Sequence, residues 1–118
     1  IMSTIKITAL GDLAVGKTCL LVSFTTHDFP PSYKPTEFDN YHAKIKVDGK
    51  DIDLDLYDTS GKDEDDLRAL SYNKTDIFML LFDINQRDSF LNCKQKWYAQ
   101  IQGIEHADIN GKQAKVPF

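Results

Sequence analysis

The pattern of apolar and polar residues near the N-terminus predicts a strand followed by a helix. Ile5–Leu10 is apolar and partly β-branched, as a strand requires, and Cys19–Phe24 opens a helix that we expect to end at about Thr26. Phe29–Thr36 contains three prolines in eight residues, so it cannot form regular structure and predicts a long surface loop.

A β-hairpin is predicted next. Asn40–Val47 and Ile52–Tyr57 have the composition of strands, and Asp48-Gly49-Lys50 between them is a turn centred on Asp-Gly. The second strand alternates strictly between apolar and acidic residues. One of its faces should therefore pack on the core, and the other should carry carboxylates.

The second half of the chain predicts one buried strand and one helix. Ile77–Phe82 is apolar on both faces, which is typical of a central parallel strand covered by helices on each side. Ser89–Gln102 predicts a helix, with Trp97 packed in the core, and Val116–Phe118 predicts the start of a further strand. The apolar stripe of this helix consists of Phe90, Cys93, Trp97 and Ile101. Together these elements predict an α/β fold.

The composition is that of one globular domain. The 118 residues are 42% hydrophobic and 27% charged, with a net charge of −4. This acidic balance argues against nucleic acid or a polybasic membrane surface as the main partner. No apolar run approaches the roughly 20 residues that span a bilayer, and the N-terminus lacks the order of a signal peptide. We therefore expect a cytoplasmic protein with reduced cysteines.

Gly11–Thr18, hereafter the phosphate loop, matches the pattern G-x-x-x-x-G-K-[ST] between a predicted strand and a predicted helix. Its glycines let backbone N–H groups turn inward, and the helix N-terminus adds the positive end of its dipole. We expect Lys17 to reach the β- and γ-phosphates of a nucleotide and Thr18 to ligate Mg²⁺. The alternative is a chance match in a turn, and the flanking strand and helix argue against it.

A second part of the site is predicted at the end of the strand after the hairpin turn. Asp58 follows Lys17 by about forty residues, and an acidic residue at the carboxyl end of such a strand is the expected Mg²⁺ partner. Gly61 would sense the γ-phosphate through its backbone N–H. Asp58-Thr59-Ser60-Gly61 alone could be any exit from a strand, but its placement relative to Lys17 favours the functional interpretation.

These motifs resemble the Rho/Rac group of the Ras-like small GTPases over nearly the whole chain. The residues that carry the resemblance are Gly11–Leu21, Phe29-Pro30, Thr36–Tyr41, Asp58–Gly61, Leu70–Tyr72 and Lys96–Tyr98. Phe38–Tyr41 and Trp97-Tyr98 look like Rho rather than Ras, Rab or Arf. The resemblance implies a P-loop (Ras-like) sheet flanked by helices, with one antiparallel edge hairpin. It also implies GTP or GDP and Mg²⁺ as ligands, and a switch in signalling to the cytoskeleton.

The resemblance implies roles for individual residues. Phe29 would lie against the guanine ring, and Tyr33 would close over the phosphates. Thr36 would ligate Mg²⁺ together with Thr18 and Asp58. The expected nucleotide-binding residues are Leu13, Ala14, Val15, Gly16, Lys17, Thr18, Cys19, Phe29, Tyr33, Thr36 and Gly61.

Two segments would respond to the nucleotide state. Residues 33–41 would form switch I and residues 59–73 would form switch II, and both would bind downstream effectors in the GTP-bound state. Exchange factors and activating proteins of the Rho type would be the other protein partners.

Two positions depart from the family pattern and affect the expected catalysis. Leu13 stands where most members carry glycine, and a side chain there projects toward the γ-phosphate and an activating arginine. Lys62 follows Gly61 where members carry the glutamine that orients the attacking water. Because phosphoryl transfer depends on positioning and charge stabilisation, we expect very slow hydrolysis and a bias to the GTP-bound state. The alternative is that Lys62 compensates by donating charge, in a catalytic set with Lys17 and Gly61.

The family's guanine-reading motif follows the next strand and does not occur in this chain, nor does a C-terminal prenylation cysteine. We therefore expect residues 1–118 to be the N-terminal portion of a GTPase domain, with the C-terminal part of the fold missing. Membrane attachment would then need a lipid anchor that this chain does not contain. Truncation here would leave Ile77–Phe82 with an unpaired edge.

Other functions stay open on the sequence. A nucleotide-locked pseudo-GTPase that serves as a scaffold would show no nucleotide exchange and no state-dependent partner. A small nucleotide kinase would need a lid with several arginines, and Arg68 and Arg87 do not cluster, so we set it aside. A non-functional fragment is the last alternative.

Overall fold

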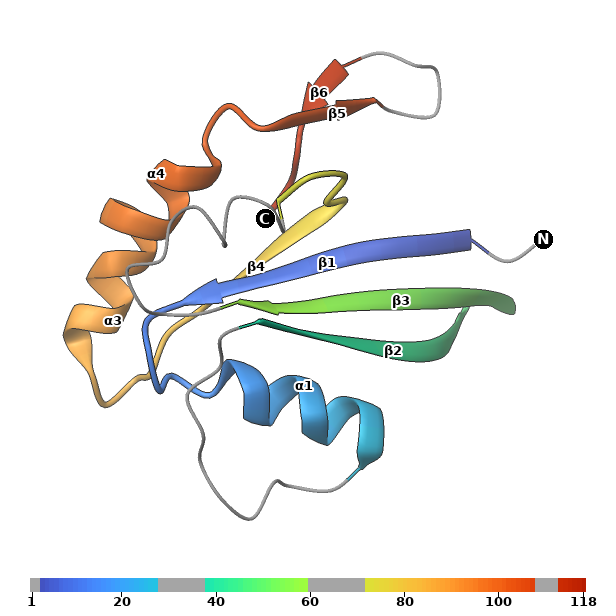
Figure 1. The fold of residues 1–118 in the computed structure, drawn as a ribbon, viewed down its shortest axis with the longest axis horizontal. Coiled ribbons are helices and arrows are strands. Elements are labelled where there is room, and N and C mark those ends of the chain that lie inside the picture. The colour runs from blue at the N-terminus through green and yellow to red at the C-terminus, as the bar shows by residue number, and fades with distance from the viewer. Residues whose placement is uncertain (1–2, 28–37, 60–71, 108–112) are drawn as a thin grey trace.

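The computed structural model describes residues 3–27, 38–59, 72–107 and 113–118. Its main sheet has four strands in the order β2-β3-β1-β4. The strands are β1 (Ser3–Gly11), β2 (Phe38–Val47), β3 (Lys50–Thr59) and β4 (Ile77–Leu81). β1 runs parallel to β3 and β4, and β2 runs antiparallel to β3 (Figure 1). This confirms the predicted α/β sheet with an antiparallel hairpin at one edge.

The hairpin between β2 and β3 confirms the predicted turn. Asp48 and Gly49, which join the two strands, have φ angles of 51° and 76°. Positive φ at both central residues is a feature of the type I′ turn, whose twist matches that of paired strands. The pairing continues from this turn as far as Phe38 and Thr59. Both strands are therefore longer than their composition predicts.

The helix predicted over Ser89–Gln102 is present, but its middle has a different geometry. It consists of α3 (Arg87–Asn92), the π-helical segment η1 (Cys93–Trp97) and α4 (Tyr98–Ile101). The Tyr98 N–H donates to the Cys93 carbonyl five residues earlier, which is the hydrogen bond of a π-helix. No helix among the described residues is long and apolar enough to cross a membrane.

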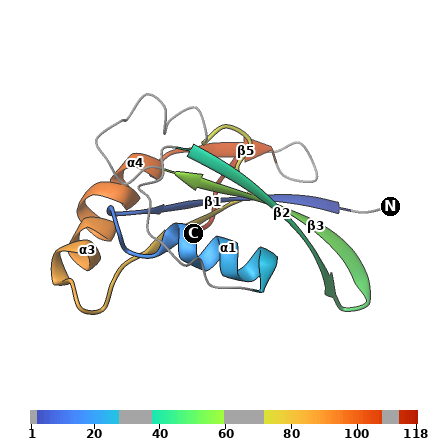
Figure 2. The ribbon, with the colours of Figure 1, turned by 60° about the horizontal axis from the view of Figure 1, so that its bottom comes forward.

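Helices cover both faces of the sheet. Successive residues of a strand point to opposite faces, so neighbouring residues of β1 pack against different helices. Ala9 of β1 packs on one side with Leu21 of α1, which spans Lys17–Thr26 and ends where the sequence predicts. Leu10 packs on the other side with Trp97, which is fully buried. Figure 2 shows α1 on one side of the strands and α4 on the other. Phe90 departs from the predicted stripe, because it is 51% exposed.

Among the described residues, the strand predicted over Ile77–Phe82 has the unpaired edge expected above, and not the central position that its apolar composition favours. β4 lies at the edge of the main sheet, and Phe82 lies beyond the end of the strand and is 43% exposed. An apolar run on both faces of a strand indicates burial by layers above and below. It does not specify which strands pair beside it.

The predicted strand at Val116–Phe118 is also wrong. The chain forms β6 (Gln113–Lys115) just before it, and β6 pairs with β5 (Glu105–Ala107) in a separate two-stranded sheet. The Pro117 carbonyl accepts a hydrogen bond from the Phe78 N–H at 2.9 Å. Proline has no N–H to continue a ladder, so the segment touches the start of β4 without forming a strand.

Candidate functional site

The phosphate loop connects the end of β1 to the start of α1. Ala14 and Gly16 adopt left-handed conformations with φ of 65° and 100°. Left-handed residues of this kind turn neighbouring N–H groups to one side, which creates an anion-binding concavity. A Cβ added to Gly16 would meet no atom within 4 Å. The backbone at Gly16 is therefore accessible to the oxygen atoms of a phosphate.

Lys17 lies inside this loop at the start of α1. It is only 5% exposed, and its Nζ donates to the carbonyl oxygens of Gly11 and Asp12, each at 2.9 Å. These hydrogen bonds offset part of the cost of removing an ammonium group from water. The loop therefore combines two left-handed residues, a helix N-terminus and a buried positive charge, which all favour a phosphate anion.

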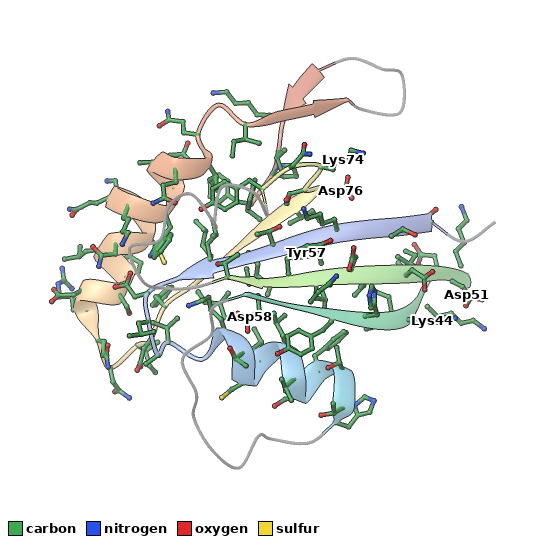
Figure 3. The ribbon with its side chains drawn as sticks, in the orientation of Figure 1. Lys44, Asp51, Tyr57, Asp58, Lys74 and Asp76 are labelled. Atoms are coloured by element: carbon green, nitrogen blue, oxygen red, sulfur yellow. The ribbon has the colours of Figure 1, made fainter. Side chains whose placement is uncertain are left out.

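Thr18 and Asp58 meet beside the phosphate loop, although they are 40 residues apart. The Thr18 hydroxyl donates to Oδ2 of Asp58 at 2.5 Å. Asp58 is fully buried near the end of β3, where it pairs with Ala9 of β1, and Figure 3 shows it close to α1. The parallel pairing of β1 and β3 places both strand ends at the same edge of the sheet. That arrangement brings the carboxylate to the loop.

The Thr18 and Asp58 pair fits a magnesium ion chemically. Hydroxyl and carboxylate oxygens are the ligands that Mg²⁺ prefers, and this ion usually takes one or two protein ligands and completes its shell with phosphates and water. Consistent with this, the described residues contain no cluster of three or more His, Cys, Asp or Glu that could hold a metal alone.

A contact that the sequence analysis missed holds Asp12 from the side of the helices. The Nε1–H of Trp97 and the amide Nδ2 of Asn92 each donate to one Asp12 carboxylate oxygen, both at 2.7 Å. We call this arrangement the Asp12 contact. Trp97 is buried in the core as predicted, but it also has this polar role. No local pattern signals it, because the partners lie 80 and 85 residues from Asp12 in the chain.

Cys93 lies next to the Asp12 contact. Its thiol donates to the Leu81 carbonyl at 3.3 Å. Burial raises the pKa of this thiol, the Asp12 carboxylate raises it further, and Lys17 acts in the opposite direction. The helical segment and the phosphate loop are thus close enough to influence each other electrostatically.

The structure places part of the predicted site and leaves the rest undescribed. Residues 13–19 form the loop and the start of α1, and Leu13 is 42% exposed. Five predicted residues lie outside the described residues, and these are Phe29, Tyr33, Thr36, Gly61 and Lys62. Most of the two predicted switch segments lies outside them too.

The described end of the predicted switch II segment packs on the core. Tyr72 is 8% exposed, and its ring meets the ring of Phe78 edge to face, with 5.4 Å between the centroids. Its hydroxyl donates to the side-chain oxygen of Gln100 in α4 at 2.7 Å. Tyr72 therefore anchors the exit of this segment on α4, which continues the helical segment whose Asn92 and Trp97 hold Asp12.

A strand, a phosphate loop and a helix, with a carboxylate at the end of the adjacent parallel strand, define a P-loop protein that binds nucleoside phosphates. A family model described as the Ras family matches residues 6–113. Because this match covers most of the chain, the protein belongs to the Ras family of small GTPases. Membership indicates a GTP-binding switch, since GTP or GDP and Mg²⁺ are the general ligands of this family. The finer assignment to the Rho/Rac group stays a prediction.

Proposed function

We propose that the protein is a switch that binds GTP and GDP at the phosphate loop. The observation that carries the proposal is the hydrogen bond between Thr18 and Asp58, because it joins the loop motif to a buried strand-end carboxylate. In this proposal, the backbone of residues 13–19 binds the phosphate oxygens. Guanine specificity rests on the family alone.

Each charged or polar group of the described site has a distinct role in this proposal. Mg²⁺, when bound, supplies charge that neutralises the phosphates. Lys17 adds a second positive charge, and its burial strengthens the attraction to a phosphate because less water screens it. Asp58 accepts the hydrogen bond of the Thr18 hydroxyl, and these two side chains would hold the metal. Thr36 of switch I adds a third oxygen in the GTP-bound state.

We also propose that hydrolysis is very slow. Leu13 is 42% exposed, and in this proposal its side chain extends into the space that an activating arginine needs. Lys62 replaces the glutamine that orients the attacking water, and Gly61 senses the γ-phosphate. An arginine finger contributes roughly 10³–10⁵ in rate, and it acts on a water that is already positioned. Because Leu13 obstructs the arginine and Lys62 replaces the glutamine, the GTP-bound state persists.

The partners in this proposal are of the Rho type. Phe38–Tyr41 and Trp97-Tyr98 support this assignment, because they are the segments that look like Rho. Effectors bind residues 33–41 and 59–73, and exchange factors and activating proteins act on the same face. In this proposal, the protein acts in the cytoplasm on signalling to the cytoskeleton.

Single-turnover hydrolysis of preloaded GTP with Mg²⁺ tests this proposal. We would compare the wild-type protein with Leu13→Gly, Lys62→Gln and the double variant, each alone and with an activating protein. The wild type should give a flat time course in both conditions. The double variant should accelerate by about 10³-fold or more with a Rho-type activating protein, and much less with a Ras-type one.

Three outcomes would contradict parts of the proposal. Hydrolysis by the wild type at the rate of the double variant would mean that Lys62 or another group positions the water. Stronger activation by the Ras-type than by the Rho-type activating protein would contradict the assignment to the Rho group. A protein that retains its nucleotide and never exchanges a fluorescent GDP would instead be a nucleotide-locked scaffold.

A further inference from the structure

The Asp12 contact joins the phosphate loop to the helical segment through two hydrogen bonds. Both oxygens of the Asp12 carboxylate are engaged, one by Trp97 and the other by Asn92, each at 2.7 Å. Hydrogen bonds to a charged group are stronger than those between neutral groups. Two of them on one carboxylate fix both its position and its rotation.

The π-helical geometry explains how Asn92 and Trp97 reach the same carboxylate. In an α-helix, residues five apart lie about 140° apart around the axis. Asn92 ends α3, and Trp97 ends η1, so the segment between them is the π-helix. Its five-residue hydrogen bonds bring such residues onto one side. The π-helical geometry therefore brings both side chains to the Asp12 carboxylate of the phosphate loop.

Trp97 is the more deeply buried of the two donors. Trp97 is fully buried in the cluster that contains Leu10 and Phe78, so its Nε1–H has a fixed position in the core. The backbone of Asp12 in turn accepts a hydrogen bond from Lys17 Nζ at 2.9 Å. A continuous series of contacts thus leads from the core, through Asp12, to the lysine of the phosphate loop.

We propose that Asn92 and Trp97 are positioning residues for the phosphate loop. Acting through Asp12, they hold the loop in its anion-binding conformation and thereby slow the release of bound nucleotide. The effect on release rests on the proposed function, whereas the effect on the loop itself does not. Neither residue belongs to the phosphate-binding motif.

Two measurements on the full chain test the two effects separately. The first is the release rate of fluorescent methylanthraniloyl-GDP in the presence of Mg²⁺ and excess GDP. The second is backbone hydrogen exchange of residues 11–18 in the nucleotide-free protein, measured by mass spectrometry. We expect Trp97→Phe and Asn92→Asp to raise both, with release about tenfold faster or more, because each removes a hydrogen bond to a charged group.

The controls separate this role from a general loss of stability. Thr75→Val removes the buried hydrogen bond between the Thr8 and Thr75 hydroxyls, 2.8 Å long, at the opposite end of β4 from the loop. It should lower the melting temperature without changing release or loop exchange. The double variant Asp12→Asn with Asn92→Asp exchanges the two partners, so it should restore slow release relative to Asn92→Asp alone.

The outcomes distinguish the two proposals. If Trp97→Phe and Asn92→Asp match Thr75→Val in loop exchange, the positioning role is wrong. If loop exchange rises but release does not, the effect on nucleotide retention is wrong. A wild-type protein that binds no GDP would refute the proposed function and the release effect together, and loop exchange would then decide the positioning role alone.

Discussion

Gly11 illustrates how a single residue determines where the phosphate loop leaves the sheet. It pairs with Leu81 of β4, and a Cβ on Gly11 would lie 2.5 Å from the Leu81 carbonyl oxygen. A backbone oxygen cannot rotate away as a side chain can, so any substitution would separate β1 from β4 or displace the loop. The same oxygen accepts the Cys93 thiol hydrogen bond. The displacement would therefore extend to η1.

Gly11→Ala should lower the free energy of unfolding by about 1–3 kcal/mol, since the added methyl group overlaps the backbone. Urea unfolding, followed by the fluorescence of the single tryptophan, Trp97, would measure this. Gly103→Ala is the matched control, because Gly103 has φ of 91° and a Cβ there would meet nothing within 4 Å. Its cost should be limited to backbone strain of about 1 kcal/mol. A Gly11→Ala protein as stable as the wild type would show that β4 shifts to accommodate the methyl group with no loss in the free energy of unfolding.

Among the elements, the β2–β3 hairpin is the one whose geometry follows most directly from local residues. Its two-residue turn requires positive φ at both Asp48 and Gly49. Aspartate tolerates this conformation because its short polar side chain can bond locally, and glycine adopts it without a steric penalty. The long β2–β3 ladder then sets the position of Asp58 at the other end of the strand.

Gly49→Ala should destabilise the hairpin by about 1–2 kcal/mol, because a Cβ is unfavourable at φ of 76° even where no neighbour is in contact. Thermal and urea unfolding would measure the loss. Asp48→Asn is the comparison, since asparagine also tolerates this conformation and should change stability by less than about 0.5 kcal/mol. Equal losses in both variants would indicate that the turn adopts another type in solution.

For the molecule as a whole, the Cys93 thiol links the core to the phosphate loop and makes stability depend on pH. Burial raises the pKa of this thiol in the folded protein, and the Asp12 carboxylate adds to the effect, against Lys17. The folded state therefore favours the neutral thiol. Its contribution to stability is complete below the pKa of an unfolded cysteine, about 8.5, and is lost as the pH rises through the folded value.

Two measurements test the raised pKa of the Cys93 thiol. Iodoacetamide at about pH 8 should modify Cys19 well before Cys93, because the thiolate is the reactive form, and peptide mass spectrometry would resolve the two sites. The stability difference between the wild type and Cys93→Ala should also decrease as the pH rises above about 9. Equal alkylation of both cysteines in the folded protein would contradict the raised pKa.

Several features of the protein follow from the sequence alone because they depend on neighbouring residues. The Gly11–Thr18 motif, the extent of α1 and the Asp-Gly turn are each encoded within a few positions, where backbone sterics and hydrogen bonding decide the outcome. The placement of Asp58 could also be expected, since parallel strands bring their carboxyl ends to one edge. The family could be recognised from the same motifs.

Other features were decided only by the tertiary structure. The π-helical register of Cys93–Trp97 is invisible in an apolar stripe that fits an α-helix equally well. The Asp12 contact joins residues 80 and 85 positions apart. Such contacts form only when packing brings separate elements within hydrogen-bond distance, so no local pattern could predict them.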